Sequence, residues 1–398
     1  MSEMLRDCFP FFKENPNSIY FDSASTSQKL KSSIDALADF YAKSCSNIGR
    51  SSYRLANRAL SQTEEVRSKI ARYIGCEADE VIFTKSATES SNLVCSSFLP
   101  LILHEGDNVA TSSVEHNSAI LPLKKASERA GASVRIVSPG KDTGIDPDEF
   151  EKNIDSNTKA AVFTCASNVS GTKIDYEKLC RICTEKGIVS ILDATQLLAH
   201  KRIDVSKLGC DFLYFSAHKM YSVSGCGILF AKKEHIEKMD PVLYGGGIVE
   251  TLSPLSIVSG NKKFEAGSPD VGAIISFGAA LDFLIENEKE IQNTEIRLCR
   301  ELSEGFEDLK DRCKLIGKAD SGLPIASFVC PGVSSYDLSS YLGAMDICVR
   351  SGKMCAHTLF DSIKTDGCIR ISLGCYNTKE EISEFFDRLD KVIRKLNV

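Results

Sequence analysis

A lysine and an aspartate stand at the ends of two apolar runs, where both could do chemistry. Lys219 closes DFLYFSAHK, and Asp193 closes VSILD. A lysine amine partly removed from water at a strand end can form a Schiff base with an aldehyde cofactor. A buried aspartate can hold the ring nitrogen of pyridoxal phosphate protonated, which makes the ring an electron sink. A solvated loop lysine and a helix N-cap aspartate remain the alternatives for Lys219 and Asp193.

Polar residues near Lys219 and Asp193 in the sequence could contact other groups of the same cofactor. Ser216 and His218 are placed to hydrogen-bond a phosphate, and Gln196 in DATQ could donate to the ring hydroxyl. In TKSATES, Ala87 and Thr88 stand where a strand gives way to a helix, and such an end offers amides and a hydroxyl to a phosphate. The same TKSATES residues also suit a plain helix cap.

Two further residues follow apolar runs upstream of Asp193. His116 in SSVEHNSAI could stack on a cofactor ring, although a lone histidine at a strand end is more often structural. Asn168 in TCASNVSGT could equally be a turn residue. By themselves these two positions predict no specific role.

The stretch RSGKMCAHTL (350–359) contains Cys355, one of 16 cysteines. A nucleophilic thiolate must be reachable and lie near cationic groups. Arg350 and Lys353 could supply that charge, and the glycine-flanked segment predicts a surface loop. Most other cysteines lie inside apolar segments, where cysteine behaves as a small hydrophobe. Cys355 is therefore the candidate for chemistry.

The chain has one C-x-x-C pair, Cys180 with Cys183, in DYEKLCRICTEKG. The segment has helical periodicity, and no second pair lies nearby to complete four zinc ligands. We therefore expect a buried helix face with reduced thiols, and no metal site.

Short β-rich runs alternate with helical stretches between residues 80 and about 230. This alternation predicts an α/β fold with a largely parallel sheet, which collects ligands at the carboxyl ends of its strands. The predicted strands are 81–84, 108–112, 134–138, 160–165, 189–194, 211–216 and 227–231.

The rest of the chain predicts a smaller α+β unit. A long helical stretch from about Gly272 to Leu309 would bridge the two parts, and strands are expected near 325–330, 346–350 and 368–373. Two capping boxes mark helix starts, Ser61 with Glu64 and Thr378 with Glu381.

Charge and hydropathy exclude some classes of function. The formal net charge is −6, which gives no general attraction to nucleic acid or to an anionic membrane. No apolar run approaches the roughly 20 residues that span a bilayer. The first residues, MSEMLRDCFPFFKENP, lack the uninterrupted apolar stretch of a signal peptide. We expect a cytoplasmic protein with neither a nucleic-acid nor a membrane partner.

The order of these motifs resembles the class V branch of the fold-type I pyridoxal-phosphate enzymes, and within it the group II, SUF-type cysteine desulfurases. The resemblance covers nearly the whole chain. It implies a large domain with a mostly parallel seven-stranded sheet and a smaller C-terminal α+β domain. The implied divisions are an N-terminal segment (1–18) packing with the small domain, a large cofactor-binding domain (19–270), and a bridging helix with the small domain (271–398). The motifs that carry it include IYFDSASTSQKL, FTKSATESSNLV, VEHNSAILPL, ASNVSGTKID, LDATQLLAHKRIDV, FSAHKMYSVSGCGILF, FEAGSPDVGAI, VRSGKMCAHTL and RISLGCYNT.

The resemblance also implies residue roles. Lys219 would bind the cofactor and move the substrate's Cα proton, His116 would stack on the ring and help to shuttle protons, and Cys355 would take the substrate sulfur. Arg370 would clamp the substrate carboxylate together with Asn168. Ser268 would reach the phosphate of a neighbouring subunit, which implies a homodimer with shared sites. The remaining implied cofactor contacts are Asp193, Gln196, Ala87, Thr88, Ser216, His218 and Asn168.

Three segments depart from the family pattern. Lys353 and Met354 stand where histidines commonly precede the cysteine, and Arg50-Ser51-Ser52-Tyr53 replaces an R-G-x-H segment. After the lysine, the segment from Tyr221 to Gly225 replaces Tyr-Gly-Pro-x-Gly.

The activity implied is conversion of L-cysteine to L-alanine with a persulfide on Cys355, for transfer to a SUF-type acceptor in iron–sulfur assembly or thiolation. Selenocysteine lyase activity is a close variant. A class V aminotransferase or related lyase in which Cys355 is a spectator is the alternative from another reaction class. A non-enzymatic scaffold that retains the fold is the third.

Overall fold

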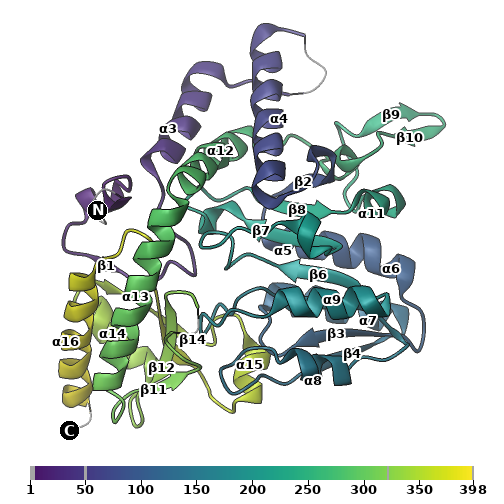
Figure 1. Ribbon diagram of the computed structural model, residues 1–398. Helices are drawn as coiled ribbons and strands as arrows, with labels where there is room; N and C mark the ends of the chain where they lie inside the picture. The colour runs from purple at the N-terminus through teal and green to yellow at the C-terminus, as the bar shows by residue number, and fades with distance from the viewer. Residues whose placement is uncertain (1–4, 49–51, 321, 397–398) are drawn as a thin grey trace.

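The computed structural model describes residues 5–48, 52–320 and 322–396. A seven-stranded sheet in the order β2-β8-β7-β6-β5-β3-β4 forms its centre (Figure 1). Strand β8 runs antiparallel to β2 and β7, and every other pair is parallel. The predicted largely parallel sheet is confirmed. Its strands are β2 (Val81–Thr84), β3 (Asn108–Ser112), β4 (Ser133–Val137), β5 (Thr158–Thr164), β6 (Val189–Asp193), β7 (Phe212–Ser216) and β8 (Gly227–Ala231).

Helices cover both faces of this sheet because alternate side chains point to opposite faces. On β2, Ile82 joins one apolar cluster with residues of α5 and α7, whereas Val81 and Phe83 join another with residues of α4, α9 and α12. The helices of this part are α2 (Phe11–Glu14), α3 (Lys31–Asp39), α4 (Arg54–Ile74), α5 (Ala87–Leu93), α6 (Leu99–Ile102), α7 (Asn117–Ala130), α8 (Pro147–Lys152), α9 (Tyr176–Lys186), α10 (Val205–Leu208), α11 (Lys233–Lys238) and α12 (Val271–Glu286).

Short elements join or extend them. A hairpin projects from the sheet (Figure 1), and π-helical or 3₁₀ turns connect several helices and strands. These are β9 (Val249–Leu252), β10 (Leu255–Ile257), η1 (Phe40–Ser44), η2 (Ala78–Glu80), η3 (Val94–Phe98), η4 (Ala217–Lys219) and η5 (Asn261–Phe264).

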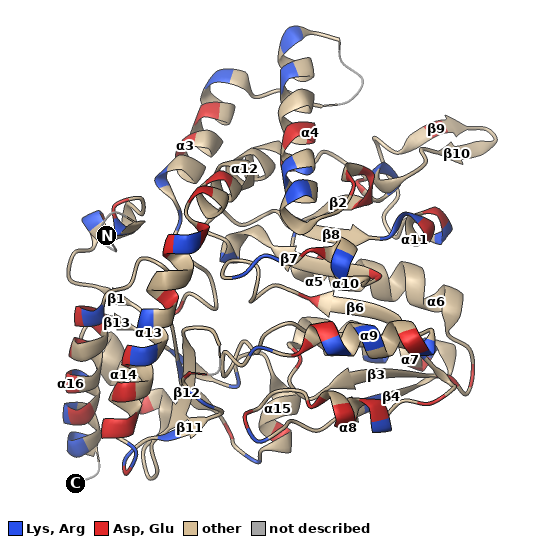
Figure 2. Cartoon of the chain, viewed as in Figure 1, with Lys and Arg blue, Asp and Glu red and all other residues tan. Residues whose placement is uncertain are grey.

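A second apolar core lies beside the large sheet, around a four-stranded antiparallel sheet in the order β11-β12-β15-β14. Acidic and basic side chains intersperse along its outer helices α13 and α16, whereas the strands of the large sheet carry few of them (Figure 2). Its elements are β1 (Ile19–Tyr20), which pairs with β13, then α13 (Glu288–Asp308), β11 (Lys314–Ile316), β12 (Ile325–Val329), α14 (Ser335–Gly343), β13 (Ile347–Cys348), β14 (Arg350–Gly352), α15 (His357–Ser362), β15 (Cys368–Ser372) and α16 (Lys379–Leu396).

Two local predictions need correction. The capping box at Ser61 and Glu64 is wrong, because α4 begins at Arg54 and both residues lie inside it. The single helix expected from Gly272 to Leu309 is divided at Asn287. The second capping box is confirmed: the Thr378 N–H donates to Glu381 Oε2 at 3.1 Å, and the Glu381 N–H donates to Thr378 Oγ1 at 3.2 Å.

The N-terminal part of the chain packs across the predicted domain division, and that division stays a prediction. Ile19 and Phe21 pack in the smaller core, whereas Leu5, Phe9 and Phe12 join the larger one. Within the described ranges, no helix combines the length and the apolar character needed to cross a membrane.

The Cys180–Cys183 pair lies on the buried face of α9, as predicted. Both side chains are fully buried, and burial raises the pKa of the Cys183 thiol to about 12. All 16 cysteines are free thiols.

Candidate active site

A cavity of about 210 Å³ opens at the carboxyl ends of the parallel strands, between the large sheet and the smaller one. Such an edge is where ligands bind in open α/β sheets. Predicted site residues from both parts of the chain line this cavity. They are Ala87, Thr88, His116, Asn168, Asp193, Gln196, Ser216, His218, Lys219 and Arg370.

Lys219 and Asp193 form the buried end of the cavity. Burial lowers the pKa of the Lys219 amine to about 8, although Asp193 acts in the opposite direction. Lys219 Nζ makes no hydrogen bond or ion pair with any described residue, so the amine remains free for a ligand. Asp193 Oδ1 accepts from the Thr195 N–H at 2.9 Å, and burial raises the pKa of this carboxyl. A fully buried carboxyl with a single amide donor retains acceptor capacity for a cationic N–H group.

The turn between β2 and α5 lies directly against β7 and β8. The Ala87 N–H donates to Ser216 Oγ at 2.7 Å. Gly227 permits this approach, because a Cβ there would lie within 2.5 Å of the Ser86 backbone. The absence of one side chain thus places Thr88 at the cavity wall beside Ser216.

The carbonyl of His218 is held by donors from the segment after β1. It accepts from Lys29 Nζ at 2.8 Å, Ser27 Oγ at 3.1 Å and Thr26 Oγ1 at 3.2 Å. This carbonyl belongs to the peptide bond that precedes Lys219, so the contacts orient that residue. Burial, Lys219 and Lys29 together lower the pKa of His218 to about 4, which keeps its ring neutral.

His116 caps α7 with its own ring. Its Nδ1 accepts from the Ser118 N–H at 3.1 Å, so the ring proton resides on Nε2. Burial and the cations Lys219, Arg350 and Arg370 lower the pKa of His116 to about 4, and the imidazole is neutral at pH 7.

Glu115, the neighbour of His116, is fully buried below the cavity. Ser112 Oγ donates to its Oε1 at 2.7 Å, and burial raises the pKa of this carboxyl to about 8. A protonated Glu115 adds no negative charge beside Asp193. Gln196 already donates from Nε2 to the Ala24 carbonyl at 2.9 Å, which leaves its second amide proton for a ligand.

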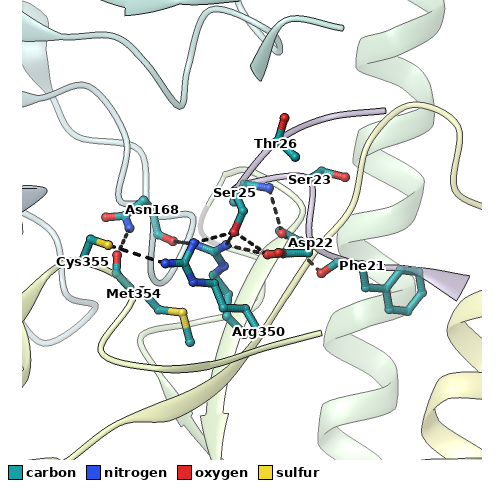
Figure 3. Close-up of polar contacts among 12 residues, drawn as sticks. Phe21, Asp22, Ser23, Ser25, Thr26, Asn168, Arg350, Met354 and Cys355 are labelled. Atoms are coloured by element: carbon teal, nitrogen blue, oxygen red, sulfur yellow. Dashed lines mark hydrogen bonds and ion pairs between the residues drawn. The ribbon is translucent and has the colours of Figure 1, made fainter. Parts of the chain in front are cut away.

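Two arginines from adjacent strands of the smaller sheet, Arg350 and Arg370, line the other end of the cavity. Arg350 lies beside Ser25 and Cys355 (Figure 3). Arg370 is 1% exposed and donates to the Asn168 carbonyl at 2.9 Å and to Asp22 Oδ1 at 2.8 Å. Its Nε is buried without a partner in the described part of the chain. Arg350 donates to Ser25 Oγ at 2.6 Å and to Cys355 Sγ at 3.5 Å. Two adjacent guanidinium groups suit an anionic ligand such as a carboxylate.

Cys355 lies at the rim, on a loop held in an uncommon conformation. Met354 and Cys355 both have left-handed backbones, with φ of 50° and 56°, which non-glycine residues rarely adopt. The Met354 carbonyl accepts from Asn168 Nδ2 and the Cys355 carbonyl from the Asn117 N–H, both at 2.7 Å. The thiol is partly exposed and borders an outer groove along α7. Of the two cations expected near it, Arg350 is in contact, whereas Lys353 pairs with Asp361 at 3.4 Å.

The described geometry agrees with comparisons to known proteins. The aminotransferase class-V family profile matches residues 19–385. The chain belongs to the class-V aminotransferase family.

Within this family, the chain is similar in sequence to cysteine desulfurases. The chain is 34% identical over 394 residues to a probable cysteine desulfurase of Halalkalibacterium halodurans, covering 97% of each protein. It is 32% identical over 402 residues to a cysteine desulfurase of Pectobacterium atrosepticum, covering 99% of this chain and 98% of that one.

Solved structures that resemble this chain are also cysteine desulfurases. The apo cysteine desulfurase of Thermococcus onnurineus superposes with a TM-score of 0.94 at 29% identity, and CsdA (S-sulfonic acid) of Escherichia coli with 0.91 at 27%. Each covers 99% of this chain and is itself covered to 98%. The predicted fold-type I class and the resemblance to cysteine desulfurases are confirmed, and the group II, SUF-type detail stays a prediction.

Ser268 is the predicted cofactor contact that does not line this cavity. It is exposed, between η5 and α12. Its predicted role involves a neighbouring subunit and stays a prediction.

Of the segments that depart from the family pattern, Arg50 and Ser51 lie outside the described residues. Tyr53 is 51% exposed, and Tyr221 has a left-handed backbone with φ of 65°.

Sequence reasoning missed several polar residues of the site. Those that line the cavity are Ser25, Ser86, Ser118, Thr164 and Thr195, and those that contact or neighbour its lining residues are Asp22, Lys29 and Glu115. Asp22, Ser25 and Lys29 come from the polar run DSASTSQK, shortly after β1. A dense polar run after a short strand was the available signal. Nothing in it indicated contact with strands more than 300 residues away.

One acidic cluster lies outside this cavity. Carboxylates of Asp211 and Glu234 and the ring of His235 come close enough to hold a cation. The ammonium group of Lys232 already pairs with the Asp211 carboxylate at 2.8 Å and supplies the positive charge of this cluster.

Proposed function

We propose that this protein is a pyridoxal-phosphate-dependent cysteine desulfurase that transfers sulfur from L-cysteine to Cys355 and releases L-alanine. One observation carries the proposal: a partly exposed cysteine in contact with an arginine lies at the rim of a cavity whose buried end holds a free lysine beside a buried aspartate. An aminotransferase needs the buried end but not the cysteine.

The residues present fit pyridoxal phosphate. Lys219 Nζ is unpartnered among the described residues, and Asp193 retains acceptor capacity for a ring nitrogen. When bound, the cofactor supplies an aldehyde for the lysine and an electron-withdrawing ring. Thr88, Ser216 and His218 would hold the phosphate, His116 would cover the ring, and Gln196 would meet the ring hydroxyl.

The chain's own groups account for the rest of the reaction. Arg370 binds the substrate carboxylate through its planar guanidinium, and its rigid partners Asp22 and Asn168 fix that orientation. Lys219 Nζ takes the proton from the substrate Cα and later returns it to the alanine product. Cys355 Sγ, as a thiolate, forms a bond to the substrate sulfur as the carbon–sulfur bond breaks.

The position of Cys355 also supports transfer to a second protein. A partly exposed sulfur beside an open groove is accessible to an acceptor thiol, for which a SUF-type acceptor is the predicted partner. The exposure of Ser268 is compatible with a homodimer that shares its sites. L-Selenocysteine would fit the same site as a second substrate. The 16 free thiols suit a reducing cytoplasm.

The test is a paired assay of the wild type and Cys355→Ser with L-cysteine and a reductant, quantifying alanine and sulfide together. Cys348→Ser, which changes another exposed cysteine, is the matched control. We expect equal alanine and sulfide from the wild type and the control, and neither product from Cys355→Ser. Alanine formation by Cys355→Ser at the wild-type rate would refute the proposed role of the cysteine. A cofactor-loaded wild type that forms neither product, but transfers an amino group to an oxo acid, would identify an aminotransferase.

A further inference from the structure

The hydroxyl of Ser25 lies between the two site arginines (Figure 3). Ser25 Oγ accepts from Arg350 Nη1 at 2.6 Å and from Arg370 Nη2 at 2.7 Å, and donates to Asp22 Oδ1 at 2.7 Å. A hydroxyl has one proton and two lone pairs, so these three contacts use its full capacity. The orientation of the hydroxyl is therefore fixed.

The two arginines depend on Ser25 to different degrees. Arg370 is almost completely buried and keeps Asp22 and the Asn168 carbonyl as partners if the hydroxyl is removed. The side-chain hydrogen bonds of Arg350 to described residues go to Ser25 and to Cys355 Sγ. Loss of the hydroxyl would thus release Arg350 and leave Arg370 in place.

Cys355 itself is held independently of this contact. Its loop is fixed by hydrogen bonds to the Met354 and Cys355 carbonyls from Asn168 and Asn117. The alternative cation, Lys353, is paired with Asp361. The guanidinium of Arg350 is consequently the partner of the thiol whose position depends on Ser25.

We propose that Ser25 is a positioning residue for sulfur capture: it holds Arg350 against Cys355, so that the guanidinium stabilises the thiolate when the thiol proton leaves to solvent. The importance of this thiolate rests on the proposed desulfurase function. The arrangement of the three side chains does not, and it can be tested in cofactor-free protein without turnover.

The experiment measures alkylation of Cys355 by iodoacetamide as a function of pH, by mass spectrometry of the tryptic peptide 354–364, which contains no other cysteine. Exposed Cys45, in the peptide 44–50, serves as the internal control. Ser25→Ala removes the hydroxyl, Ser25→Thr retains it, and Arg350→Gln removes the cation. The double variant Ser25→Ala/Arg350→Gln completes the cycle.

We expect Ser25→Ala to slow alkylation of Cys355 at pH 7 by about three- to tenfold and to move the half-maximal rate to higher pH. Ser25→Thr should stay within about twofold of the wild type, and Cys45 should not change. The double variant should react no more slowly than Arg350→Gln alone, since Ser25 acts through Arg350.

Three results would overturn the proposal: an unchanged profile in Ser25→Ala, additive losses in the double variant, or an equal loss in Ser25→Thr and Ser25→Ala. A wild type that forms no alanine would remove the proposed function while leaving this outcome intact.

Discussion

The two ends of the site are built in different ways. Asp193 is buried at the end of β6, and Lys219 lies partly buried in the turn that follows β7, where both line the cavity. Cys355 is partly exposed on a strained loop that follows an edge strand of the smaller sheet. Lys219 thus lies inside the cavity, whereas Cys355 borders the outer groove along α7.

The difference lies in how each end controls ionisation. Burial is the main cause that lowers the pKa of Lys219, and the charges of Arg370 and Arg350 act in the same direction. Cys355 is only partly buried, and its nearest cation is a side chain held by one hydroxyl. Substitutions at the buried end should therefore cause large losses of activity. Substitutions at the rim should change the reactivity of Cys355 by smaller amounts.

The largest effect should come from removing the amine. Lys219→Ala should lower alanine formation by about 10³-fold or more, because both the cofactor-binding amine and the proton acceptor at Cα are lost. Measured with L-cysteine, alanine formation within tenfold of the wild type would place the essential base elsewhere. Circular dichroism should be unchanged, because Nζ has no described partner.

The pH dependence of cofactor capture should report the burial of Lys219. The neutral amine is the nucleophile, so capture by cofactor-free protein should rise about tenfold from pH 6 to pH 7 and level off above about pH 8 to 9. Stopped-flow absorbance follows the reaction. A rate that continues to rise tenfold per unit beyond pH 9 would indicate an ordinary exposed lysine and contradict the buried geometry.

Lys29 should have a moderate effect at the buried end. Lys29→Met removes a charged donor to the His218 carbonyl and should lower the free energy of unfolding by about 1.5–3 kcal/mol. It should also raise the pKa of His218, which Lys29 now lowers. Histidine NMR titration and denaturant unfolding measure the two effects. Lys31→Met, which removes an exposed lysine paired with Asp35, is the control and should leave His218 unchanged.

The smallest effect should come from the second cation near the rim. Lys353→Met removes a charge two residues from Cys355 but one already paired with Asp361. Alkylation of Cys355 should change by less than about twofold, as for an exposed ion pair. A tenfold loss would make Lys353, rather than Arg350, the principal cation at the thiol.

Much of the fold follows from local pattern. The strands 81–84, 108–112 and 227–231 were predicted residue for residue, and the other strands of the large sheet within a few residues, because buried strands are apolar runs between polar turns. Ser61 and Glu64 failed as a helix start, since the same two residue types also occur inside a longer helix. Asn287 interrupts a pattern that reads as one helix: α12 packs in the larger core, whereas α13 passes from that core at Ile291 to the smaller one at Leu298.

The sequence by itself determined which residue types stand at the ends of the strands, and hence the gathering of Lys219, Asp193, Ser216 and His218 at one edge. Parallel topology brings such residues together without further information. Only the tertiary structure decided that Arg350 contacts Cys355 whereas Lys353 does not, and that Ser25 lies between two arginines. The contacts of Ser25 join segments more than 300 residues apart, and the contact between Arg350 and Cys355 depends on a left-handed loop. No local periodicity encodes either arrangement.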